Sequence, residues 1–66
     1  MKLIELPRGL PFILDDRLYF RDYLCTFGRV SLIKAYRFED GRIDFKLPQY
    51  YDPDTEITPY VRKKRE

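Results

Sequence analysis

The stretch RLYFRDYLCTF, from Arg17 to Phe27, fits both a helix and a strand. The fold class of this chain therefore depends on which of the two it forms. Four of its apolar residues follow the i, i+3, i+4, i+7 spacing that forms one narrow stripe on a helix. These four are Phe20, Tyr23, Leu24 and Phe27. The period of the pattern therefore favours a helix.

The flanking residues supply start and stop signals for that helix. Asp16 can cap its N-terminus by accepting hydrogen bonds from first-turn amides. Gly28 follows its last residue, where a left-handed conformation commonly ends a helix. Residue type favours a strand instead, but Arg21 and Asp22 would then place a charge on each face. We predict a helix over residues 17–27 and keep a long strand as the alternative.

The segment after Gly28 predicts a β-hairpin over residues 30–47. Asp40-Gly41 suits a two-residue type I′ turn, since both positions need a positive φ. This loop sets a register in which Glu39 opposes Arg42 and Arg37 opposes Asp44 as opposite-charge pairs. The other face is apolar and is expected to form the core. It carries Tyr36, Phe38, Ile43, Phe45 and Leu47.

These elements predict an α+β fold in which the helix 17–27 packs on a small antiparallel sheet. A strand over residues 2–6 is expected to extend the sheet edge, and residues 12–14 form a short apolar run. Residues 48–60 hold three prolines, which predict an irregular arm that packs over the domain or pairs a short strand around residues 56–57. The alternative is an all-β meander or SH3-like barrel. Residues 1–61 are expected to form one domain, followed by a basic tail at residues 62–66.

The composition excludes several kinds of site. The chain has 66 residues, no histidine and one cysteine, Cys25, so neither an internal disulfide nor a zinc site of Cys and His is expected. No nucleophile–base pair, phosphate loop or calcium loop is recognisable. We predict no catalytic, cofactor-binding or metal-binding residues, no small-molecule substrate and no enzymatic activity. Cys25 is expected to be a small core thiol.

Charge is unevenly placed along the chain. The net charge is +2, but residues 62–66 hold four of the thirteen basic side chains and one of the eleven acidic ones, so the rest is slightly acidic. Such a cluster can bind phosphates electrostatically. DNA or RNA binding is therefore the second candidate function. Its candidate residues are Lys34, Arg37, Arg42, Lys46, Arg62, Lys63, Lys64 and Arg65.

Protein binding is the first candidate function, because the aromatic content is 17% and tyrosines lie among the prolines of the arm. Tyrosine is favoured at interface hot spots. The candidate residues are Tyr50, Tyr51 and Tyr60. We predict a non-enzymatic interaction module that docks on a protein partner or self-associates, as an accessory, regulatory or viral factor. Charges and prolines interrupt residues 1–14, so a cytoplasmic protein without a membrane segment is expected.

Residues 32–51, LIKAYRFEDGRIDFKLPQYY, resemble the closing hairpin of small SH3-like archaeal chromatin proteins, in which Lys-Leu-Pro is followed by acidic residues and tyrosine. The rest of the chain departs from that family. Residues 17–27 have no counterpart there, and the body of the chain is not basic. Membership of the family is not inferred.

Overall fold

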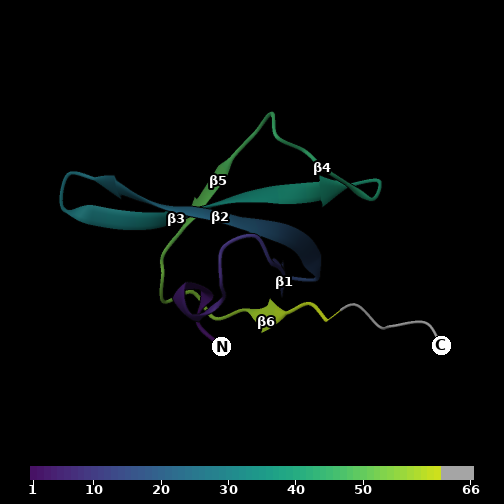
Figure 1. Cartoon of the computed structure of the whole chain (residues 1–66), viewed down its shortest axis with the longest axis horizontal. Helices are drawn as coiled ribbons and strands as arrows, with labels where there is room; N and C mark the ends of the chain where they lie inside the picture. Colours follow the sequence, from purple (N-terminus) through teal and green to yellow (C-terminus); the bar gives the residue numbers. More distant parts are fainter. Residues whose placement is uncertain (62–66) are drawn as a thin grey trace.

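The computed structural model describes residues 1–61, and in this part of the chain it contains antiparallel strands and a 3₁₀ turn but no α-helix. The strand order is β4-β3-β2-β1-β6, with β5 paired to β3 (Figure 1). The elements are η1 (Leu3–Glu5), β1 (Pro11–Leu14), β2 (Arg17–Phe27), β3 (Val30–Glu39), β4 (Arg42–Ile43), β5 (Gln49–Tyr51) and β6 (Thr58–Pro59). The predicted α+β fold with a packed helix is wrong, and the predicted basic tail lies outside the described residues.

The predicted helix over residues 17–27 is the strand β2, which pairs with β1 on one side and β3 on the other. The two supposed caps are turn residues. Asp15 and Asp16 have φ of 52° and 64°, as a type I′ hairpin turn requires. Gly28 has φ of 64° at the first position of the next two-residue turn, which is the type II′ pattern. Sheet partners on both sides decide in favour of the strand.

A β-bulge explains why β2 imitates a helical period. The register with β3 shifts between Arg21 and Leu24, so that Asp22 and Tyr23 together oppose Lys34. A bulge inserts one extra residue and shifts the alternation of faces by one position. Across the bulge, apolar residues are therefore no longer spaced by two positions. Their spacing of three and four positions matches that of a helical stripe.

The Asp40-Gly41 hairpin is confirmed. Glu39 pairs with Arg42 and Phe38 pairs with Ile43, as the two-residue loop predicts, and φ is positive at both turn positions. The regular ladder of β4 ends at Ile43. The charge pairing differs from the prediction, because Arg37 Nη2 binds Glu39 Oε2 at 3.0 Å along its own strand, while the Asp44 carboxylate accepts from the Lys46 amide.

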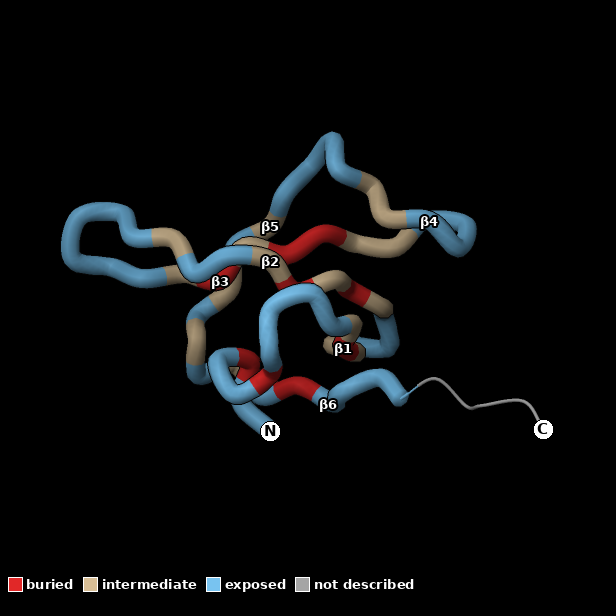
Figure 2. The backbone as a smooth tube through the Cα atoms, viewed as in Figure 1, coloured by how far each residue is buried: buried red, intermediate tan, exposed pale blue. Residues whose placement is uncertain are grey.

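The core lies on the opposite face of β3 from the one predicted. Ile33 and Ala35 are fully buried, whereas Phe45 is 63% exposed and Leu47 is 71% exposed. The buried cluster draws on both ends of the chain as well as on the sheet (Figure 2). Its members are Leu3, Leu6, Phe12, Tyr19, Ile33, Ala35 and Ile57. Leu3, Leu6 and Ile57 cover one face of the sheet, so that face became the core.

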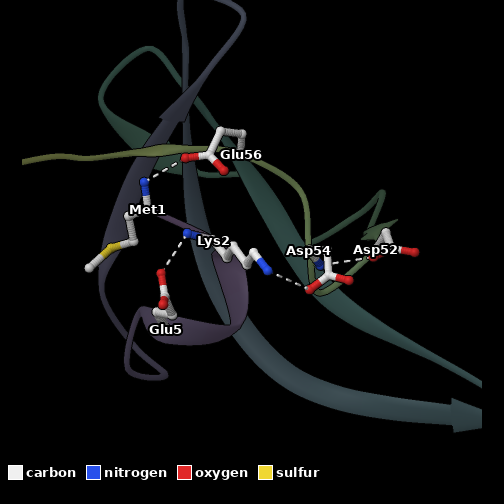
Figure 3. Close-up of polar contacts among 6 residues, drawn as sticks. All are labelled: Met1, Lys2, Glu5, Asp52, Asp54 and Glu56. Carbon is white, nitrogen blue, oxygen red and sulfur yellow. Dashed lines mark hydrogen bonds and ion pairs between the residues drawn. The ribbon is translucent and has the colours of Figure 1, made fainter.

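The N-terminal segment is a 3₁₀ turn and not the predicted edge strand. Leu3 and Leu6 are three residues apart, so one tight turn directs both side chains into the core. The Glu5 carboxylate accepts from the Lys2 amide at 2.8 Å, and the Met1 ammonium donates to Glu56 Oε2 at 2.7 Å (Figure 3). The segment is thereby fixed against the end of the arm.

The predicted arm does carry short pairings. β5 extends one edge of β3, and β6 extends the outer edge of β1. Between them the Leu3 amide donates to Thr55 O at 2.9 Å, and the Ile57 amide donates to Met1 O at 2.8 Å. The arm thus runs from one side of the sheet to the other and encloses the core.

Candidate docking surface

The face of the sheet opposite the core carries a continuous row of side chains, here called the outer patch. The register places Phe27 opposite Val30 and Tyr50 opposite Lys34, and Val30, Lys34 and Tyr36 share one face of β3. Phe45 joins this face through its ring contact with Tyr36. The members are Phe27, Val30, Lys34, Tyr36, Phe45 and Tyr50. The row follows β3 for most of its length.

Ring contacts join these residues into one surface. Phe27 and Tyr50 lie edge to face with centroids 5.4 Å apart, and Tyr36 and Phe45 do so at 4.9 Å. Lys34 is paired with Tyr50 in the register, and its Nζ lies 5.5 Å from the Tyr36 centroid, so Lys34 lies between the two aromatic pairs. Aromatic contacts of this kind stabilise by about 0.5–1.5 kcal/mol beyond the area they bury.

Most of the outer patch is open to solvent. Phe27 is 51% exposed, Val30 55% and Tyr50 42%, whereas Tyr36 is buried. Lys34 places one charge in the middle of the row. Its pKa is raised, chiefly by a side-chain interaction with the Tyr36 hydroxyl, so the ammonium keeps its charge at neutral pH. A contiguous exposed apolar surface with a fixed charge is typical of a binding site.

The structure separates the three predicted partner-binding tyrosines. Tyr50 belongs to the outer patch, but Tyr51 points to the core face, because consecutive strand residues alternate. Tyr51 packs edge to face on Tyr19 at 5.6 Å and donates to Gln49 Oε1 at 2.8 Å. Burial raises the pKa of the Tyr51 hydroxyl. Tyr60 is 41% exposed and follows β6, on the other edge of the sheet.

The predicted nucleic-acid-binding residues are also dispersed. Lys34 lies on the outer patch, whereas Arg37 and Arg42 lie on the opposite face with Glu39 between them. Lys46 is exposed in the segment that follows β4. The other four lie outside the described residues: Arg62, Lys63, Lys64 and Arg65. No single basic face forms among the cations that the structure describes.

Arg21 is a buried charge on the core face of β2. It is 8% exposed, and its Nη1 donates to the Asp22 carbonyl at 2.7 Å, directly at the bulge. Its Nε has no hydrogen-bond partner among the described residues. The guanidinium satisfies a carbonyl at the irregular point of the strand, which is a structural role.

Two further features offer little for chemistry. A hollow of about 330 Å³ is lined by Arg17, Leu18, Arg37, Phe38 and Glu39, and the Arg37–Glu39 ion pair neutralises part of its charge.

The Cys25 thiol is half-buried on the ribbon, and not in the core as predicted, with its Sγ 3.8 Å from the Tyr23 carbonyl oxygen. Within residues 1–61, no three potential metal ligands gather, and no helix could cross a bilayer.

Comparison with known proteins finds no matching family model, no similar curated protein and no similar solved structure.

Sequence reasoning missed Phe27, Val30 and Phe45 as surface residues. Phe27 and Val30 flank Gly28-Arg29, and a glycine at the first position of a two-residue loop is a hairpin signal. That signal identifies the turn and the pairing of the two residues. It does not say which face of the ribbon the core covers.

Proposed function

We propose that this chain is a non-enzymatic interaction module that docks on a protein partner through the outer patch. The observation that supports the proposal most is that Phe27 and Tyr50 pack on each other and remain about half exposed. Rings held rigid by a neighbour lose little conformational entropy on binding, which makes them effective anchors. Their exposure leaves the apolar area available for a partner.

Lys34 narrows the kind of partner. Its ammonium lies between the two aromatic pairs, so a matching surface carries apolar side chains around a carboxylate. A second copy binding face to face near a two-fold axis would bring two Lys34 charges together. The outer patch therefore suits a different protein better than another copy of this chain.

The experiment is a pull-down from a nuclease-treated lysate with single variants of the full chain. Tyr50→Ala should weaken capture of a defined partner by about thirtyfold, as hot-spot truncations do. Tyr60→Ala is the matched control, since this tyrosine is equally exposed but lies on the other sheet edge. It should leave capture unchanged.

Equal losses in the two variants, or no loss in either, would contradict the outer patch as the docking surface. Lys34→Glu gives a second readout, because charge reversal should abolish binding to a partner with a facing carboxylate. Hydrogen exchange of the complex should show new protection near Phe27 and Tyr50. DNA or RNA binding stays a prediction, and capture that disappears after nuclease treatment would favour it.

A further inference from the structure

The outer edge of β2 is open along the end of the ribbon that projects from the sheet (Figure 1). β1 pairs with β2 only as far as Phe20, and Arg21 makes the last backbone bonds, to Gly9 and Leu10. In the described part of the chain, residues 23–27 have β3 on one side and no strand on the other. Figure 2 shows this end of the ribbon as largely exposed.

The register identifies which backbone groups point into solvent. Phe27 and Val30 close a two-residue turn and so exchange hydrogen bonds with each other. Antiparallel pairs alternate between bonded and non-bonded, so Cys25 is directed inward to Leu32. Leu24 and Thr26 therefore direct their N–H and C=O groups to the open edge.

Beyond Tyr23, whose ring packs under the Arg8 guanidinium at 3.7 Å, this edge lacks the usual protection against pairing. Natural edge strands carry charges, prolines or covering segments, because free backbone groups otherwise recruit another strand. Residues 23–27 read Tyr-Leu-Cys-Thr-Phe and contain no charge, no proline and no glycine. Leu24 is 46% exposed and Tyr23 is 55% exposed. Two copies of an uncharged edge can pair without electrostatic repulsion. Two copies of the outer patch would instead bring two Lys34 charges together.

We propose that two copies of this chain pair antiparallel through the open edge of β2, with a two-fold axis at Cys25. Leu24 of each copy then opposes Thr26 of the other, and their outward N–H and C=O groups exchange hydrogen bonds. Cys25 opposes itself as a non-bonded pair. Tyr23 opposes Phe27 of the second copy, which forms an aromatic cross-strand pair.

The register is self-consistent, because the outward-pointing residues meet each other and the inward-pointing residue lies on the axis. Pairing also adds strands to a ribbon that has only two at this end, and two strands alone are marginally stable. The pairing uses the backbone edge of β2, whereas the proposed function uses the outer patch, and the two share Phe27. Thr26→Pro tests the pairing and Tyr50→Ala tests the docking, so either proposal can fail without the other.

The first test is sedimentation equilibrium of the full chain under reducing conditions, which should show a reversible monomer–dimer equilibrium. Thr26→Pro removes an outward N–H from each copy and should weaken dimerisation by about tenfold or more. Ser31→Pro is the matched control, since Ser31 is opposite Thr26 on the β3 edge of the same ribbon. It should leave the dimer unchanged while perturbing the ribbon equally.

A chain that stays monomeric up to the millimolar range would overturn the proposal. So would a dimer that Ser31→Pro weakens as much as Thr26→Pro does. Far-ultraviolet circular dichroism confirms that each variant keeps its sheet.

The second test uses the axis itself. Cys25→Lys and Cys25→Glu should each be monomeric alone, since the two-fold axis places like charges opposite each other. An equimolar mixture should form a mixed dimer, seen by native mass spectrometry as a species of twice the chain mass that neither variant forms alone. Dimers of either variant alone, or a mixture without the mixed species, would show that Cys25 is not on the axis.

Discussion

Phe27 at the tip of the β2–β3 ribbon lies edge to face with Tyr50 of β5, with their ring centroids 5.4 Å apart. β5 pairs with the middle of β3, from Ile33 to Ala35. This contact therefore fastens the projecting ribbon to the arm that closes the core.

The Phe27–Tyr50 contact should stabilise the fold measurably. A double-mutant cycle of Phe27→Ala and Tyr50→Ala, followed by urea unfolding, should give a coupling energy of about 0.5–1.5 kcal/mol. The cycle of Phe27→Ala with Tyr60→Ala is the control and should give a coupling near zero. A Phe27–Tyr50 coupling no larger than the control would mean that the rings do not pack in solution.

Truncations should distinguish the true core from the exposed face of the hairpin. Phe12 is fully buried and stacks on Tyr19 at 5.4 Å, so Phe12→Ala should cost about 3–5 kcal/mol. Phe45 is 63% exposed, so Phe45→Ala should cost about 1 kcal/mol or less. Chemical denaturation measures both values. The reverse order would place the core on the face that the sequence pattern suggests.

Gly41 should tolerate only those residues that accept a positive φ. Nothing lies within 4 Å of the position of an added Cβ, and φ is 77°, so the cost of substitution is backbone strain alone. Gly41→Val should destabilise the fold by about 1–3 kcal/mol. Gly41→Asn should cost much less, since asparagine adopts this conformation readily. Equal midpoints for the two variants in thermal melts would contradict the type I′ turn.

A single substitution in the Asp15-Asp16 turn should stabilise the fold. Asp16 has φ of 64°, and glycine is favoured at the second position of a type I′ turn. Asp16→Gly should therefore raise the free energy of unfolding by about 1 kcal/mol. A melting temperature lower than that of the parent would contradict the type I′ assignment of this turn.

Acid should weaken the attachment of the arm to the N-terminal segment. The hydrogen bond from the Met1 ammonium to Glu56 lowers the pKa of this carboxyl below its ordinary value of 4.5. A lowered folded pKa stabilises the fold above the unfolded pKa, and this contribution is lost as pH falls through the folded pKa. Stability should therefore decline below about pH 4.5 more steeply in the parent than in Glu56→Gln.

The N-terminal amine supplies the control for the acid effect. Acetylation removes the charge that lowers the Glu56 pKa and should make the parent behave like Glu56→Gln. An acetylated chain that retains the parent's acid sensitivity would assign the effect to another carboxyl. Lys2 also lowers the pKa of Glu56, but by less than the Met1 ammonium does. Its Nζ lies 3.7 Å from Asp54 Oδ1.

Local residue patterns were sufficient to predict the turns of this protein and the pairings next to them. Asp40-Gly41 specified a turn and a register, because few residue pairs accept two positive φ values. The pairings of Glu39 with Arg42 and of Phe38 with Ile43 followed from that turn. Local chemistry could also have identified the turn at Gly28-Arg29, where glycine holds the first position.

The conformation of β2 and the side of the sheet that forms the core depend on contacts between segments that are distant in the sequence. A bulge at Asp22 and Tyr23 breaks the alternation that would identify a strand, and only pairing with β1 and β3 reveals it. Alternation assigns residues to two faces without saying which face is covered. Leu3, Leu6 and Ile57 come from the two ends of the chain and cover one face, so Phe27 and Tyr50 on the other remain exposed.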